Sequence, residues 1–549
     1  MISLNLLIST FSFYALLRLS HLLFKRFLAC SPLDNIPGPR GNLLLQGSVS
    51  EIFGFKSWGF HRKLAQRYGS VAKINGLLGD KLLYVFDPLA MHHILLKVRF
   101  LQSYSYQSIN PSRLILNGLQ LGDGHKKQRK MLAPIFSAAH MRNMGRFSHI
   151  CVSILENAFA EKVKNGPQEI DVLSWSGRTA LELIAQSGLG SSFDSFTEGA
   201  VPHPFVNAAK RIVIVLGKTV MFRIYVLPYV LKIGTPKFWR AILERLPSET
   251  FQEALQISDL MHDTSVKIYQ SKKDALAQGD GAFKDHIAQG NDLISILMKN
   301  NLSASKDKRL SESQVIAQMS TFTFAATDTT STAISRTLWL LSQQQDVQNT
   351  LQAELCDAML LSGKDTLSYD DLAGLKSPDA VCRDLLRLYP PVPALVRIAL
   401  QDTVLPLQSP ATGLDGQPMH EVLVPKGTNI IISVFNCNRN PAIWGQDADE
   451  FKPNRWNDLP EFVTDARIPG VYSNLMTFGG GARSCIGFNF SQLEMKVILS
   501  LLLQRFRFTL PPDKEIYWNM MGIVSPCVIG DTDSSPPRLP LIVEEIDRD

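Results

Sequence analysis

The chain has 549 residues, of which 45% are hydrophobic and 19% charged, a composition that excludes a disordered, collagen-like or coiled-coil protein. Its 56 Lys and Arg against 50 Asp and Glu leave a net charge of +6, which is too small at this length to indicate nucleic-acid binding. The cysteines are odd in number and form no C-x-x-C pair, which argues against a disulfide scaffold or a zinc ribbon and favours reduced thiols.

Residues 1–26 are predicted to anchor the chain in a membrane. Ile2 to Leu17 carry no charge, and a helix extended to about 23 residues would span roughly 34 Å, enough to cross a bilayer. Lys25 and Arg26 follow, which places the bulk of the chain in the cytosol. A cleaved signal peptide is the alternative, but the segment lacks a basic start and a clear cleavage site. Residues 27–45 are rich in proline and are predicted to form a stiff hinge.

Residues 46–549 are predicted to form one large domain, mainly α-helical with small β-sheets. Length alone suggests three or four domains, but no long linker and no internal repeat divides this part of the chain. Residues 120–340 follow a helical pattern, and residues 397–436 are richer in β-branched residues and turn signals. Ala275 to Asn291 are predicted to form a surface loop, and a long helix is predicted to start after Gly487.

The segment 478–487 reads FGGGARSCIG and places Cys485 just before that last helix. The helix dipole and the free N–H groups at this end, with Arg483 nearby, favour a thiolate. Glycines on both sides allow the backbone to approach the sulfur. A buried structural cysteine in a glycine-rich turn is the alternative. The complete pattern F-x-x-G-x-R-x-C-x-G instead favours an anionic, sheltered sulfur ligand.

This pattern resembles the haem-binding loop of the cytochrome P450 family. The resemblance implies haem b as the cofactor, with Cys485 as the axial thiolate that ligates its iron. It further implies that Arg483 binds a haem propionate and that Phe478 shields the thiolate. The implied fold is that of the family, a single large haem domain behind an N-terminal membrane helix.

A long helix is predicted from Glu312 to Ser342, and its middle reads AATDTT at 325–330. Threonine hydroxyls in a buried helix compete with the backbone hydrogen bonds and can open the helix locally. In the family this segment forms an oxygen-activation groove, so Asp328 would relay protons and Thr329 would bind dioxygen or its water. The family more often has Gly where this chain has Ala326. A threonine-rich packing face is the alternative.

Asp384 and Arg387 are three residues apart on a predicted helix, so they can pair. They resemble the acid–x–x–Arg pair of the family, with Arg455 in the segment FKPNRW as its partner. The resemblance implies that this network holds the haem loop behind the thiolate. Where the family has Glu, this chain has the shorter Asp384. An ordinary surface ion pair is the alternative.

Three further residues are implied by the resemblance to bind haem propionates, namely His125, Arg129 and Arg397. His125 stands where the family often has Trp. The remaining cations of that helix, which should face elsewhere, are Lys126, Lys127 and Lys130. They are interpreted either as a docking patch for an acidic electron donor or as a solvated surface.

Apolar segments are predicted to line a substrate pocket, namely residues 105–118, Ile212 to Leu231, Phe322, Pro393 to Val396 and Met520 to Val524. The sequence therefore predicts a fungal haem-thiolate monooxygenase that inserts one oxygen atom of O2 into a lipophilic substrate, either terpenoid, steroid-like or polycyclic aromatic. No nucleotide-binding domain is recognised, so NADPH would deliver electrons through a separate flavoprotein reductase, with cytochrome b5 as an additional donor. The predicted location is the endoplasmic reticulum membrane, with a single pass and a cytosolic catalytic domain.

Two other functions stay open at this point. One is a haem-thiolate isomerase or dehydratase that uses no O2, and the other is a non-catalytic haem-binding protein. The acid–alcohol pair Asp328 and Thr329 argues against both, because neither function needs a proton relay at the haem.

Overall fold

The computed structural model describes residues 30–40, 47–97, 100–102, 122–194, 196, 203–227, 235–278, 292–363, 367–520, 522–531 and 535–546. The predicted membrane anchor and the pocket segment 105–118 lie outside the described residues. Within the described ranges, no helix combines the length and the apolarity needed to cross a bilayer. The division of the chain at residues 26 and 45 stays a prediction.

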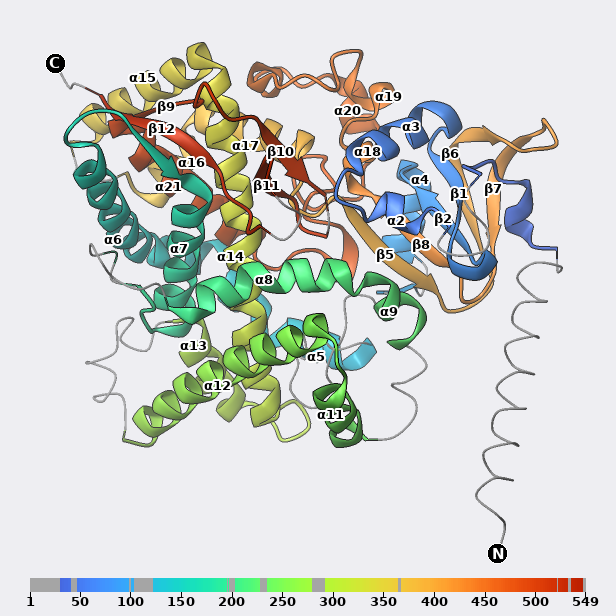
Figure 1. The fold of residues 1–549 in the computed structure, drawn as a ribbon, viewed down its shortest axis with the longest axis horizontal. Coiled ribbons are helices and arrows are strands. Elements are labelled where there is room, and N and C mark those ends of the chain that lie inside the picture. The colour runs from blue at the N-terminus through green and yellow to red at the C-terminus, as the bar shows by residue number, and fades with distance from the viewer. Residues whose placement is uncertain are drawn as a thin grey trace, which may run out of the picture.

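The described part is mainly helical with small sheets, as predicted (Figure 1). The helices are α2 (Val49–Ile52), α3 (Trp58–Tyr68), α4 (Pro88–His92), α5 (Gly122–Leu132), α6 (Ala138–Val163), α7 (Val172–Ile184), α8 (Pro204–Lys218), α9 (Val220–Tyr225), α11 (Pro236–Arg245), α12 (Glu249–Gln278), α13 (Leu293–Ser303), α14 (Glu312–Gln343), α15 (Gln345–Ser362), α16 (Tyr369–Gly374), α17 (Lys376–Leu388), α18 (Val434–Cys437), α19 (Pro441–Trp444), α20 (Glu461–Asp465) and α21 (Phe488–Arg505). The predicted start of the surface loop at Ala275 was wrong by a few residues, because α12 continues to Gln278.

The largest sheet has five strands in the order β1-β2-β8-β5-β3, and only β2 and β8 run parallel. Its strands are β1 (Val71–Asn75), β2 (Lys81–Val85), β3 (Phe100–Gln102), β5 (Ala394–Ala399) and β8 (Asn429–Ser433). A three-stranded sheet joins β4 (Gln168–Asp171), β12 (Pro540–Glu545) and β9 (Phe506–Thr509), and two hairpins pair β6 (Thr403–Thr412) with β7 (Pro418–Val424) and β10 (Ile516–Asn519) with β11 (Ser525–Val528).

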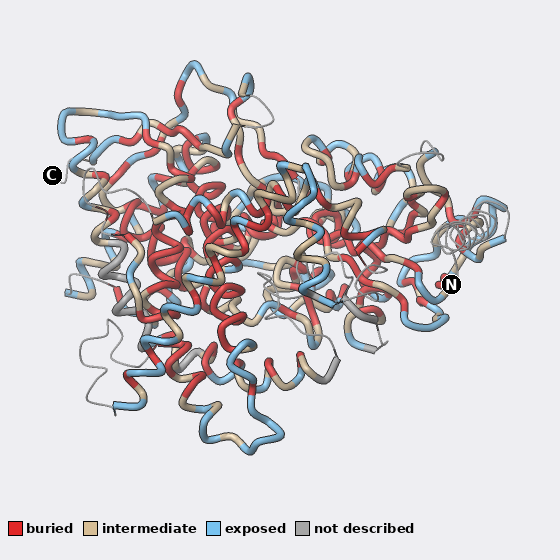
Figure 2. Tube along the Cα trace, turned by 60° about the horizontal axis from the view of Figure 1, so that its bottom comes forward, coloured by how far each residue is buried: buried red, intermediate tan, exposed pale blue. Residues whose placement is uncertain are grey.

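In Figure 1 the five-stranded sheet lies on the right, the helical part lies on the left, and α14 runs through the middle of the molecule. Buried residues concentrate in the interior of both parts, while exposed residues follow the outer loops (Figure 2). Most of α14 and of α21 is buried, so both are core helices.

The predicted strands within residues 397–436 are present, but the turn at Pro425 to Gly427 does not close a hairpin. The strand before it, β7, pairs with β6, whereas the strand after it, β8, pairs with β2 and β5. Gly427 has φ +88° and donates its N–H to the carbonyl of Ala399 at 2.8 Å. The turn residues therefore allow the chain to change direction, and tertiary pairing selects the partner strand.

Residues 30–40 are the described part of the predicted hinge, and they pack on the five-stranded sheet. Leu33 and Ile36 are buried, and the backbone N–H of Lys73 in β1 donates to the carbonyl of Pro37 at 2.9 Å. A Cβ atom added at Gly38 would lie 1.9 Å from the carbonyl oxygen of Lys73, so only glycine fits there. This stretch is thus fixed to the folded body.

The threonines of α14 do not open the helix, which is continuous from Glu312 to Gln343. Instead many of these hydroxyls donate to the carbonyl four residues earlier, a pattern shared by Thr321, Thr323, Thr327, Thr329 and Thr337. Back-bonding of this kind satisfies a buried hydroxyl without breaking the backbone ladder. A capping box of Ser311 and Gln314 fixes where the helix begins.

Candidate active site

The loop around Cys485 is closed by its own backbone. The N–H of Cys485 donates to the carbonyl of Phe478 at 2.8 Å. Gly479 and Gly481 have φ +66° and +67°, which side-chain-bearing residues rarely adopt. A Cβ atom added at Gly480 would lie 2.0 Å from the carbonyl oxygen of Pro469. The glycines are thus required both for the turn and for close packing.

Cys485 is solvent-accessible, although protein surrounds it. Burial raises the pKa of its thiol, while the backbone N–H of Gly487 and the charge of Arg129 lower that pKa. The expected preference for thiolate from the helix N-terminus is outweighed by desolvation in the metal-free protein. A metal ion would deprotonate a thiol that coordinates it. Its exposed sulfur is available as a ligand.

Three of the predicted propionate-binding residues lie together beside this sulfur. Arg129 of α5 donates from Nη2 to Oγ of Ser484 at 3.0 Å and from Nη1 to the carbonyl of the same residue. Burial, together with the charges of Arg483 and Arg129, lowers the pKa of His125 to about 4. His125 is therefore a neutral side chain at physiological pH, and the two arginines supply the positive charge. Ser484 is a contact that sequence reasoning missed.

The two remaining predicted haem contacts are Arg397 on β5 and Phe478 at the start of the cysteine loop. Arg397 lies buried on β5 and donates from Nη1 to the carbonyl of Val396 at 3.0 Å. The ring of Phe478 packs against Tyr472 and Phe488, with ring centroids 5.4 Å and 6.1 Å apart. The shielding of the thiolate by Phe478 stays a prediction.

The middle of α14 presents one open face. Ala325 is exposed, and Ala326 and Thr329 are half-buried, although residues on both sides of this stretch are buried. Thr329 donates its hydroxyl to the carbonyl of Ala325 at 2.7 Å, so the oxygen of that hydroxyl can still accept a hydrogen bond at the open face. Asp328 is buried beside it, and desolvation raises the pKa of its carboxyl to about 7.

Lys210 of α8 is the cation that acts on Asp328, and the sequence analysis did not single it out. Its charge lowers the pKa of Asp328, while Asp328 and Asp171 partly offset the fall that burial causes in the pKa of Lys210. Val206 and Val213, one turn to either side on α8, are buried. A lysine on the apolar face of an amphipathic helix is a signal that could have identified it.

An aromatic contact links the cysteine loop to α14. A Cβ atom added at Gly487 would lie 3.9 Å from the ring of Phe136, so the loop packs directly on this side chain. The ring of Phe136 meets that of Phe322 in α14 edge to face, with centroids 5.5 Å apart. The two predicted halves of the site are thus connected through buried aromatic packing that includes Phe322, whose place in the substrate pocket stays a prediction.

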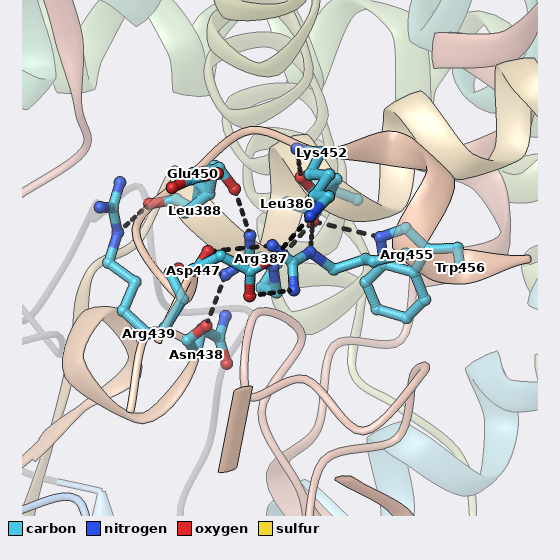
Figure 3. A network of polar contacts seen from close by, with 12 residues as sticks. Leu386, Arg387, Leu388, Asn438, Arg439, Asp447, Glu450, Lys452, Arg455 and Trp456 are labelled. Carbon is cyan, nitrogen blue, oxygen red and sulfur yellow. Dashed lines mark hydrogen bonds and ion pairs between the residues drawn. The ribbon is translucent and has the colours of Figure 1, made fainter. Parts of the chain in front are cut away.

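The structure brings Asp384, Arg387 and Arg455 together in a buried network. Figure 3 shows Arg387 and Arg455 of this network side by side. Arg387 donates from Nε to Oδ1 of Asp384 at 2.7 Å, and both side chains are 0% exposed. Nε of Arg455 lies 3.3 Å from the same oxygen. The backbone N–H of Lys452 and the indole N–H of Trp456 also donate to Asp384. The shorter Asp384 therefore finds a full set of partners.

Polar contacts connect this network to Met476 and Thr477, the residues that directly precede the cysteine loop. Arg387 donates to the carbonyl of Glu450 at 2.8 Å and reaches the carbonyl of Asn438. The amide of Asn438 donates to Oγ1 of Thr477 at 2.8 Å and accepts from the backbone N–H of Met476 at 2.8 Å. Two residues later the chain enters the loop at Phe478–Gly479. The network thus fixes the position from which the loop starts.

Replacing Asp384 with Ala should destabilise the protein by about 3–5 kcal/mol, because two arginines would lose their buried counter-charge. Asp384→Glu should cost much less, since it keeps the carboxylate. The matched control is Asp449→Ala, because the Asp449 side chain is 47% exposed and its ion pairs with Arg62 and Arg439 should be worth about 0–1 kcal/mol. Chemical denaturation of the three variants checks this prediction, and an equal loss in Asp384→Ala and Asp449→Ala would contradict it.

The lysines of α5 face away from the sulfur. Lys126 and Lys130 are exposed and Lys127 is half-buried, whereas His125 on the same helix is buried. This arrangement agrees with the expected separation of the two faces. Docking of an electron donor at the three lysines stays a prediction.

Comparison with known proteins identifies relatives over nearly the whole chain. The sequence model of the family described as Cytochrome P450 matches residues 37–526. Cytochrome P450 monooxygenase 91 of Postia placenta is 44% identical over 520 residues, which are 94% of each chain. Cytochrome P450 monooxygenase 212 of the same fungus is 43% identical over 93% of this chain and 94% of its own. The ganoderic acid synthetase CYP5150L8 of Ganoderma lucidum is 40% identical over 96% of each chain.

Proposed function

The chain belongs to the cytochrome P450 family, and on this premise we propose which of its residues carry the reaction and what kind of substrate it takes. Like its fungal relatives, it is a haem-thiolate monooxygenase, an oxidoreductase that incorporates oxygen from O2. The family implies haem b with a cysteine thiolate as axial ligand. The monooxygenase relatives argue against the two alternatives, an isomerase or dehydratase that uses no O2 and a non-catalytic haem-binding protein.

The residues around Cys485 fit this cofactor, and they carry the proposal. A solvent-accessible sulfur lies in a tight glycine loop, and the cationic side chains of Arg129 and Arg483 stand beside it. A soft sulfur ligand suits iron, and two arginines suit the two carboxylates of a haem. In our proposal Cys485 ligates the iron, while Arg129, Arg483, Arg397 and the neutral donor His125 hold the propionates. When bound, the haem supplies the activation of O2 and the transfer of one oxygen atom to a C–H bond.

The open face of α14 is proposed to handle protons. Thr329 accepts a hydrogen bond there from a water, since its own proton is committed to the carbonyl of Ala325. Asp328, with a pKa of about 7, can hold a proton or release it near physiological pH. Lys210 of α8 lowers the pKa of this carboxyl by its charge, and Asp171 interacts with the same lysine. Proton delivery would follow the order Lys210, Asp328, Thr329.

The substrate is proposed to be lipophilic, of terpenoid, steroid-like or polycyclic aromatic type. The predicted pocket segments that are described are largely apolar. They include the buried Phe322 of α14 and the buried loop residues Met520 and Val524, of which Val524 accepts a hydrogen bond from Thr332 of α14. Ile212 and Val215 of the predicted run 212–231 are buried on α8. One relative is named a ganoderic acid synthetase, which supports a role in secondary metabolism.

Electrons are proposed to come from NADPH through a separate flavoprotein reductase, with cytochrome b5 as an additional donor. The exposed Lys126 and Lys130 offer positive charge to an acidic partner. We also propose that residues 1–26 anchor the protein in the endoplasmic reticulum membrane with the catalytic domain in the cytosol. The uncharged stretch and the following Lys25 and Arg26 support this orientation.

Replacing Thr329 with Ala tests the proposed role of the open face. With NADPH and a reductase supplied, we expect NADPH consumption to continue while product falls about 10-fold or more and peroxide appears, because protons no longer reach the correct oxygen atom. Thr327→Ala is the matched control, since Thr327 is fully buried and bonds only the carbonyl of Thr323. Coupled turnover in Thr329→Ala, or turnover without any reductase, would contradict the proposal.

A further inference from the structure

Four residues of α14 form one stripe along the helix, and the stripe is open at one end and covered at the other. Ala325, Thr329, Thr332 and Arg336 follow the spacing i, i+4, i+7 and i+11, which places them on a common face. Ala325 is exposed and Thr329 half-buried, whereas Thr332 and Arg336 are buried. The residues that cover the second half belong to the hairpin of β10 and β11, which Figure 1 shows beside α14 and α17.

Thr332 holds the hairpin by a hydrogen bond that leaves its own helix. Its hydroxyl donates to the carbonyl of Val524 at 3.0 Å, while the hydroxyls of Thr327, Thr329 and Thr337 bond carbonyls of α14. The backbone N–H of Val524 donates in turn to the carbonyl of Pro391 at 2.9 Å. Val524 is therefore clamped between α14 and the chain that leaves α17.

Arg336 holds the strand of the hairpin by its guanidinium group. The centre of that group lies 3.8 Å from the ring of Tyr389, 4.2 Å from Trp518 and 4.5 Å from Trp339. Within the described part of the chain, Nε and Nη1 of Arg336 have no hydrogen-bond partner, so aromatic faces provide much of its environment. Burial lowers its pKa to about 9, which leaves it charged at physiological pH.

Contacts from the opposite side complete the attachment. The indole N–H of Trp58 donates to the carbonyl of Trp518 at 2.6 Å, and the backbone N–H of Met520 donates to the carbonyl of Phe55 at 3.2 Å. Met520 and Val524 are both 1% exposed. The hairpin is thus held between residues 55–58 and α14. Thr329 lies on the same helix, α14, as the residues that hold the hairpin.

We propose that Thr332 and Arg336 are positioning residues that set where the β10–β11 hairpin ends the open stripe of α14, and that they thereby decide which part of a substrate lies next to Thr329. Three residues along a helix correspond to about 4.5 Å, so the attachment at Thr332 lies within one turn of the proposed catalytic threonine. A shift of the hairpin would move the wall of the site at that distance. This specificity role rests on the proposed function, whereas the attachment itself does not.

Hydrogen–deuterium exchange of the full-length, haem-loaded protein tests the attachment without requiring turnover. Thr332→Val keeps the shape of the side chain but leaves the carbonyl of Val524 unpaired, so the amides of 516–520 and 522–528 should exchange about fivefold faster. Arg336→Leu should raise exchange of the same amides by about tenfold or more. Thr332→Ser should restore protection. The matched control is Thr337→Val, whose buried hydroxyl bonds only the carbonyl of Ala333 and which should leave the hairpin unchanged.

The specificity role is tested with one steroid probe, progesterone, in the presence of NADPH and a reductase. Thr332→Val should change the ratio of hydroxylated products by about threefold or more with an unaltered haem absorption spectrum, while Thr332→Ser and Thr337→Val keep the ratio. If progesterone is not turned over, its dissociation constant should still rise in Thr332→Val but not in Thr337→Val.

Unchanged hairpin exchange in both Thr332→Val and Arg336→Leu would overturn the attachment. Faster exchange with unaltered product ratio and unaltered probe binding would overturn the specificity role. Failure of the proposed function looks different, because the wild-type protein would then lack the haem-thiolate spectrum while the exchange differences persisted.

Discussion

Replacing Cys485 with serine is expected to remove the absorption band that reduced, carbon-monoxide-bound haem shows when a thiolate is its axial ligand. A serine oxygen is a harder and less electron-rich ligand than a thiolate sulfur. Product formation should fall on the order of 10³-fold or more, equivalent to about 4 kcal/mol of activation free energy. The measurement is the difference spectrum of the purified protein, followed by turnover with NADPH and a reductase.

Cys356→Ser is the matched control for this experiment. Cys356 is an exposed cysteine of α15, outside the loop that contains Cys485. Its replacement should leave both the spectrum and the turnover at wild-type values. A thiolate-type spectrum that survives in Cys485→Ser, or one that disappears in Cys356→Ser, would show that the sulfur ligand is assigned wrongly.

Replacing Asp328 with Asn should lower product formation by about 10²-fold, because the amide keeps the size of the side chain but cannot exchange a proton. The wild-type enzyme should show a change in rate near pH 7, where the buried carboxyl titrates. In Asp328→Asn this change should be absent. Rates of product formation measured across about pH 6 to 8 with saturating reductase check this prediction.

The same substitution should change how stability depends on pH. Burial raises the pKa of Asp328 from 3.8 to about 7 in the folded protein, so the folded state keeps a proton that the unfolded chain has lost. The wild-type protein should therefore lose stability as pH rises between about 4 and 7. Asp328→Asn carries no such group, so its advantage in free energy of unfolding should grow through this window and level off above it.

Glu312→Gln is the control for both readouts of Asp328. Glu312 lies at the exposed N-terminal end of α14, so neutralising it changes a charge on the same helix without affecting the buried segment. We expect wild-type rates and a wild-type pH profile. A rate change near pH 7 that persists in Asp328→Asn would mean that another group provides it.

Local patterns were sufficient for the elements that carry the site. The complete motif around Cys485, the start of α21 at Phe488 and the extent of α14 follow from glycine positions and apolar periodicity. The i, i+3 spacing of Asp384 and Arg387 was sufficient to expect their pairing. These features depend on residues that are close in the chain, and short-range geometry is what sequence patterns encode.

Long-range contacts were beyond such patterns. Lys210 acts on Asp328 from a helix more than a hundred residues away in the chain, and no spacing rule connects them. Ser484 was overlooked because its partner Arg129 comes from α5. The expected opening of α14 by its threonines did not occur, since whether a hydroxyl bonds its own helix or another element depends on what packs against it.

By itself the sequence determined the family and the cofactor class, and it singled out Cys485 as the candidate ligand, because this cysteine, its glycine loop and a nearby arginine lie within ten consecutive residues. Only the tertiary structure decided which side chains surround that ligand and how they ionise. The pKa of Asp328 near 7 and the neutral His125 arise from desolvation by protein packed around them. Desolvation depends on every neighbouring element at once, and a linear pattern does not contain it.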